Sequence, residues 1–195
     1  MSMSVDQFLS LSDAEQLQTI KDLNDIGQED IIIDVLTGVG IDNLSAPLLG
    51  ELGRAYNNND KPEEAIKVFK AIDKKHRDSV WHYRCAYSYG SIVSSNREAY
   101  TSENMQQMLA LLDSGVQLAT KENRNDIREY CFEVMDMCRL QMDFEKCEVD
   151  YPDLCLNYSN YIAEKKKKKE GVPRQRTITV EEILATDDMW TINEP

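Results

Sequence analysis

The chain has few of the residues that interrupt helices, because its 195 residues include only five prolines and eight glycines. Proline removes a backbone donor and glycine favours irregular conformations, so this scarcity suits a mostly helical protein. No apolar run approaches the length needed to span a bilayer. The first residues, MSMSVDQFLSLSDAEQ, contain neither the basic nor the long apolar segment of a secretory signal, so we expect a cytoplasmic protein.

The patterns that accompany catalysis or metal binding are also missing. Five cysteines form no CxxC pair, and their odd number does not suit a disulfide framework. The only histidines, His76 and His82, fit a helix end and helix packing better than general-base chemistry. Cys131 and Cys138 lie two turns apart on one apolar helix face, where free cysteine behaves as a small core hydrophobe. No nucleotide-binding or hydrolase motif is present, so we predict no enzyme activity, no cofactor and no metal.

Positive charge is scarce. The chain has 22 Lys and Arg against 35 Asp and Glu, which gives a formal net charge of −13. Such a surface repels phosphates, so we predict neither a nucleic-acid nor a membrane partner. The exception is Lys165–Lys169 with Arg174 and Arg176, which is compatible with a nuclear-localisation signal or with a contact to an acidic or phosphorylated partner. We favour a solvated helix end, where lysines interact well with the helix dipole.

A pattern of small and large residues recurs in residues 46–91. It has the spacing W-x2-L-G-x2-Y, with Leu in the Trp position, followed by A-x3-F: Leu49, Leu52, Gly53, Tyr56, Ala65 and Phe69. Gly53 and Ala65 are small enough for two antiparallel helices to approach closely, and Pro62 suits the first turn of the second helix. Further along the chain, Cys85-Ala86-x2-Tyr89 repeats the spacing of Leu52-Gly53-x2-Tyr56.

This pattern resembles that of the tetratricopeptide repeat family, whose period of about 34 residues is close to the interval from Gly53 to Ala86. The resemblance implies an all-α fold, a short right-handed solenoid of helical hairpins, in a short cytoplasmic array of the bacterial type. It also implies that the first helices of successive hairpins line a concave groove that holds a peptide or a partner helix. The carboxylate clamp of some family members is not expected, because Gly50 and Arg54 occupy the positions of its Lys and Asn.

On this interpretation the chain has five parts. Residues 1–45 form a degenerate N-terminal hairpin, in which the Ile31–Ile33 run fits a buried strand by periodicity but a helix by its acidic start and glycine end. Residues 46–78 are the clear repeat, with helices near 45–58 and 62–75. Residues 79–121 are an expanded repeat, with either a longer first helix or a projecting loop. Residues 122–148 are a capping helix from Asp126 to Phe144, and residues 149–195 form a C-terminal helix, the basic segment and a partly ordered tail.

The candidate binding residues face away from the contact between the two helices of each hairpin, and they are Arg54, Asn57, Asn58, Tyr83 and Tyr87. Tyrosine suits a mixed polar and apolar segment, because it offers apolar area with a hydrogen-bonding tip. The alternative is that Tyr83 and Tyr87 pack between helices and that Arg54 pairs with nearby acids.

We therefore predict a non-catalytic protein–protein interaction scaffold that binds a protein or peptide partner in the groove. The alternative function is an acidic inhibitor or immunity-type protein that covers a basic enzyme. Salt separates the two, because binding through surface charge weakens steeply with ionic strength. The sequence leaves the oligomeric state open.

Overall fold

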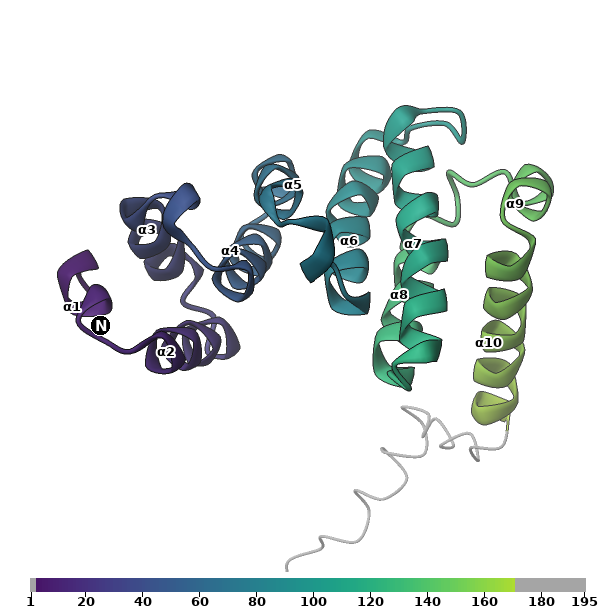
Figure 1. Cartoon of the computed structure of the whole chain (residues 1–195). Helices are drawn as coiled ribbons and strands as arrows, with labels where there is room; N and C mark the ends of the chain where they lie inside the picture. Colours follow the sequence, from purple (N-terminus) through teal and green to yellow (C-terminus); the bar gives the residue numbers. More distant parts are fainter. Residues whose placement is uncertain (1–2, 171–195) are drawn as a thin grey trace, which may run out of the picture. The chain divides into compact units, whose positions relative to one another are not determined.

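The computed structural model describes residues 3–170, and every regular element in that range is helical (Figure 1). The elements are α1 (Val5–Leu9), α2 (Asp13–Asp25), α3 (Glu29–Val39), the 3-10 helix η1 (Ile41–Asn43), α4 (Ala46–Asn58), α5 (Pro62–Ala71), the 3-10 helix η2 (Lys74–His76), α6 (Ser79–Asn96), α7 (Glu103–Lys121), α8 (Asn125–Met137), α9 (Phe144–Asp150) and α10 (Pro152–Glu170). The described residues divide into two units, the first ending at Tyr161 and the second beginning at Ile162. The tail, with Arg174, Arg176 and the Thr177–Val180 segment, lies outside the described residues.

Helix starts recur at a constant interval in the first half of the chain. The N-cap residues of α2, α4 and α6 are Ser12, Ser45 and Asp78, which are equally spaced in the sequence. Ser12 forms a capping box with Glu15 at the start of α2. The second helices α3 and α5 begin at Glu29 and Pro62, which are separated by the same interval. The N-terminal hairpin therefore has the helix spacing of residues 46–78, although it lacks their sequence motif.

The same interval appears in a hydrogen bond between consecutive first helices. The side-chain amide of Asn24 in α2 donates to the backbone oxygen of Glu51 in α4, at 3.1 Å. One interval further along the chain, the amide of Asn57 in α4 donates to the backbone oxygen of Arg84 in α6, at 3.0 Å. Because each bond joins one first helix to the next, α2 lies beside α4 and α4 lies beside α6.

The close contact predicted at Gly53 is confirmed. A Cβ atom at Gly53 in α4 would lie 2.5 Å from the ring of Phe69 in α5, which is well inside van der Waals contact. Phe69 is fully buried, so a Cβ at position 53 would have to displace a packed ring. The contact between α4 and α5 therefore requires glycine at this position.

The extra residues of the 79–121 segment lengthen its first helix. α6 has 18 residues, whereas α2 and α4 have 13 each. It ends at Asn96, and its C-cap Arg97 has a φ of 51° in the left-handed region. A short loop then leads to Ser102, the N-cap of α7. The longer α6 packs against both α7 and α8.

Two helix ends differ from the sequence-based expectations. α5 ends at Ala71 instead of near residue 75, because Ile72 takes an extended backbone conformation that buries its side chain. The basic residues Lys74–His76 form the separate turn η2, where Asp73 caps the amide of Lys75. By contrast, the Ile31–Ile33 run is helical, as its acidic start and glycine end indicated, and α3 ends at Val39 before the C-cap Gly40, whose φ is 91°.

The capping helix expected from Asp126 to Phe144 is two helices instead of one. α8 ends at Met137, and α9 begins at Phe144 after an N-cap, because the Asp143 carboxylate accepts the amide of Lys146. The apolar spacing continues through Cys138 and Met142, and both side chains are buried even though the backbone is no longer helical. The helical spacing of apolar residues therefore continues past the end of α8, because residues after the helix are also buried.

Tyrosine hydroxyl bonds and aromatic ring contacts join α9 and the first part of α10 to the preceding residues. The Tyr100 hydroxyl donates to Asp150 at 2.8 Å, and the Tyr158 hydroxyl donates to Asp136 at 3.0 Å. Phe132 in α8 contacts the rings of Tyr158 and Tyr161 in α10. At the far end of α10, in the second unit, the side chains of residues 165–167 are exposed.

Two glycines of α4 allow a matched test of the α4–α5 contact. We expect Gly53→Ala to lower the free energy of unfolding by about 1–3 kcal/mol, because the added methyl group overlaps the buried Phe69 ring. We expect Gly50→Ala to raise it by about 0.5–1 kcal/mol, because alanine favours the helix and its Cβ would be 3.9 Å from the nearest atom. Urea unfolding followed by circular dichroism measures both. A Gly53→Ala protein as stable as wild type would rule out the close crossing.

Candidate binding groove

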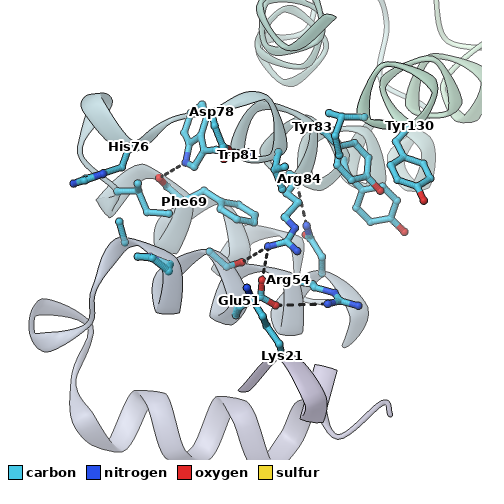
Figure 2. Close-up of a pocket in the computed structure, with 18 of the residues that line it drawn as sticks. Lys21, Glu51, Arg54, Phe69, His76, Asp78, Trp81, Tyr83, Arg84 and Tyr130 are labelled. Carbon is cyan, nitrogen blue, oxygen red and sulfur yellow. Dashed lines mark hydrogen bonds and ion pairs between the residues drawn. The ribbon is translucent and has the colours of Figure 1, made fainter. Parts of the chain in front are cut away.

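Helices α2, α4 and α6, each the first of a helical pair, line one groove of about 940 Å³ together with α8 (Figure 2). Its lining comes from α2, α4, α6 and α8, with Phe69 and Ile72 from the end of α5 and His76 from η2. Residues of α3 and α7 are not part of it. We call this feature the groove. Its position follows from the spacing of α2, α4 and α6 and from the packing of α8 against α6.

All five residues predicted for partner binding line the groove, namely Arg54, Asn57, Asn58, Tyr83 and Tyr87. The two asparagines among them form hydrogen bonds to other helices. The Asn57 amide donates to the backbone of Arg84 and accepts the Ser88 hydroxyl at 2.7 Å, so its hydrogen-bonding atoms are engaged between α4 and α6. Asn58 donates to Glu29 at 3.2 Å. A partner contact for the five residues stays a prediction.

A charged cluster that the sequence analysis missed lies at the centre of the groove. The Glu51 side chain is only 8% exposed, and its carboxylate lies 3.0 Å from the Arg84 guanidinium and 3.6 Å from that of Arg54 (Figure 2). Asn24 donates to the same carboxylate at 2.9 Å. Arg84 also donates to the backbone oxygen of Gly50. We call these side chains, Asn24, Glu51, Arg54 and Arg84, the Glu51 cluster.

The alternative interpretation of Arg54 is confirmed, because it pairs with two acids. Its guanidinium lies 2.9 Å from Asp25 in α2, in addition to its contact with Glu51 in its own helix. The Arg54 side chain is nevertheless 31% exposed at the groove surface. Arg54 therefore joins α2 to α4 while one part of it faces solvent.

Three tyrosines form an aromatic ledge at the α6–α8 side of the groove. The Tyr83 and Tyr130 rings are stacked with centroids 5.3 Å apart, and Tyr87 follows one turn after Tyr83 on α6 (Figure 2). Burial raises the pKa of the Tyr83 phenol, and the nearby Tyr87 adds to the effect, so its hydroxyl stays protonated at neutral pH. Tyr130 was missed because α8 was expected only to close the array. Its sequence signal is an aromatic residue immediately before Cys131, off the apolar face of α8.

Trp81 forms the opposite wall, and its polar atom is satisfied internally. The indole Nε1 donates to the backbone oxygen of Phe69 at 2.9 Å (Figure 2). The Arg77 guanidinium lies 4.4 Å from the centre of the Trp81 ring. His82 contacts the Trp81 ring edge-on and bonds the backbone of Asp78, which agrees with its expected packing role. His76 is exposed in η2.

The cysteines behave as core residues. All five are free thiols and buried, including Cys131 and Cys138, whose core position was predicted. Burial raises the pKa of Cys85, Cys131 and Cys138 to about 12 each. The Cys147 and Cys155 sulfurs are 2.8 Å apart at the α9–α10 junction. Among the residues that the structure describes, no group of three or more His, Cys, Asp or Glu is placed to hold a metal ion.

In the described part of the chain, no helix combines the length and the apolar character needed to cross a membrane. Comparison with protein-family models, with curated proteins and with solved structures finds no match for the chain. The groove's geometry is therefore the basis for a functional proposal.

The Glu51 cluster gives the second prediction. We expect Arg84→Met to lower the free energy of unfolding by about 2–3 kcal/mol. The change removes the ion pair that offsets the loss of hydration of the buried Glu51 carboxylate. The matched change Arg124→Met breaks the exposed pair with Asp126 and should cost less than about 1 kcal/mol. Adding Glu51→Gln to Arg84→Met should recover part of the loss, because it removes the unpaired charge. Equal effects of the two arginine changes in urea unfolding would contradict the buried cluster.

The thiols give the third prediction. At pH 8 a buried thiol with a pKa near 12 is protonated and shielded, so iodoacetamide should label the native protein on the order of 100-fold more slowly than the urea-unfolded protein. Mass spectrometry should then count five labels after unfolding without reductant. Addition of a chelator should leave the melting curve unchanged. Fewer than five labels would indicate a disulfide, and a lower melting temperature with the chelator would indicate a bound metal.

Proposed function

We propose that the protein is a non-catalytic, cytoplasmic interaction scaffold whose groove binds a peptide segment or a helix of a partner protein. The observation that supports this most directly is that α2, α4, α6 and α8 line one groove, while α3 and α7 take no part in it. A surface built from alternate helices is continuous over several helix pairs, so it suits an extended or helical segment better than a compact small molecule.

The equal spacing of Ser12, Ser45 and Asp78 supports the further proposal that the chain is a short tetratricopeptide-like solenoid. So do the close contact at Gly53 and the repeated asparagine bond between first helices. In such a solenoid the groove would be its concave face. The longer α6 would belong to the expanded repeat, and α8 would follow it as the next groove-lining helix.

The chemistry of the lining also favours a protein partner. Tyr83, Tyr87 and Tyr130 offer apolar area with hydroxyl groups, and tyrosine and arginine are the residue types most enriched among interface hot spots. The net charge of −13 makes a nucleic-acid partner unfavourable.

Site-specific photo-crosslinking in cells tests the proposal. A benzophenone amino acid at Tyr87 should crosslink to a partner protein, because this position faces the groove. The same amino acid at Lys67, which is exposed on α5 outside the groove, should not give that product. Mass spectrometry then identifies the partner and the crosslinked segment.

The purified partner allows a quantitative test. The double change Tyr83→Ala and Tyr87→Ala should weaken its binding by more than about tenfold, given the usual effect of truncating interface tyrosines. Changing Lys165–Lys169 to Gln should leave binding unchanged, and circular dichroism should show that both variants fold. If the lysine variant alone loses the partner, the basic segment is the binding element and the groove is not. Strong weakening by salt together with intact binding of the tyrosine variant would favour the acidic-inhibitor alternative.

A further inference from the structure

The groove has two chemically different sides. On the α2–α4–α6 side, Lys21, Arg54 and Arg84 place cationic groups toward it (Figure 2). On the α6–α8 side is the aromatic ledge of tyrosines. Arg84 and Tyr83 are neighbours on α6, so the two sides meet on this helix. A bound segment that crosses α6 would contact both.

The acidic residues of the lining are already engaged. The Glu51 carboxylate contacts Arg84, Arg54 and Asn24. Asp126 pairs with Arg124 at 2.8 Å, and the Asp78 carboxylate accepts the Trp81 amide as the N-cap of α6. A cationic ligand would have to compete with each of these contacts.

The cationic residues, by contrast, keep donors for a ligand. Lys21 is exposed and forms no ion pair with any residue that the structure describes. Arg84 uses its Nη1 atom for both Gly50 and Glu51, while its Nε and Nη2 atoms make no hydrogen bond to the described residues. Because the Arg84 side chain is 20% exposed, these donors are open to the groove.

The groove therefore differs in charge from the chain as a whole. Its lining has four Lys or Arg residues and three Asp or Glu residues, whereas the whole chain has a net charge of −13. Charged interfaces are arranged so that opposite charges meet, and a mismatch of like charges is costly. A basic segment would be attracted to the outer surface but would meet Lys21 and Arg84 inside the groove.

We propose that the groove's partner is an acidic segment that also contains an aromatic or large aliphatic residue. One or more carboxylates lie against Lys21 and Arg84, and the large apolar side chain lies on the ledge formed by Tyr83, Tyr87 and Tyr130. This inference rests on the proposed function, because it names the chemistry of the segment that the groove binds.

Selection from a phage-displayed library of random dodecapeptides, at about 0.15 M salt, tests the inference and does not require an identified partner. The full chain is the bait. The enriched peptides should combine Asp or Glu with Phe, Tyr, Trp or Leu. A fluorescently labelled synthetic copy of the most enriched peptide is then titrated by anisotropy.

Two matched charge reversals distinguish a contact inside the groove from the long-range electrostatic effect of the protein's net charge. Lys21→Glu should weaken the peptide about tenfold, because it places a negative charge beside the bound carboxylate. Lys67→Glu makes the same change on the exposed face of α5 and should alter the affinity by less than about twofold. Tyr130→Ala should weaken the peptide strongly, and Tyr130→Phe should largely restore it, because the stacked ring remains.

The outcomes distinguish the two proposals. Enriched basic peptides that lose binding in the Tyr87→Ala variant would keep the groove as the site and overturn the acidic partner. An equal loss of peptide affinity in Lys21→Glu and Lys67→Glu would show that the total charge of the protein sets the affinity. That result would also overturn the proposal of an acidic partner in the groove. If no peptide is enriched, or if binding is unaffected by both Tyr87→Ala and Tyr130→Ala, the proposed function itself fails and the inference fails with it.

Discussion

The Glu51 carboxylate is the point on which the arrangement of α2, α4 and α6 depends. A buried carboxylate loses its hydration, so it is tolerated only where charged and polar partners replace the lost water. Arg84 comes from the next first helix, Asn24 from the preceding one and Arg54 from the same helix. The contacts of this one group therefore join three of the helices that line the groove.

The repeated asparagine bond has a related effect at the backbone level. Asn24 and Asn57 each satisfy a carbonyl oxygen on the following first helix, so neighbouring helices are joined by a bond that does not depend on charge. The aromatic ledge has a different origin, because Tyr130 reaches Tyr83 only where α8 packs against the long α6. The groove thus has a polar side, where the asparagine bond recurs between α2, α4 and α6. It also has an aromatic side, where α8 packs against the longer α6.

The helices followed from the sequence where local signals agreed. Pro62 at a helix start predicted α5, and the acidic start and glycine end around Ile31–Ile33 predicted α3. The expectation of one helix from Asp126 to Phe144 was wrong. Buried apolar residues continue at helical spacing through Cys138 and Met142, although α8 has already ended. Periodicity reports burial, and a buried loop residue gives the same signal as a helical one.

The sequence by itself determined that the protein is helical, that Gly53 marks a close helix contact and that five residues lie on the groove-lining side of α4 and α6. These follow from residue size and helical spacing, which are local properties. Only the tertiary structure decided that Arg54 pairs with Asp25, that Asn57 is engaged between helices, and that Glu51 and Arg84 meet. Those pairings join residues of different helices that are far apart in the sequence, and whether two such side chains touch depends on how the helices pack against one another.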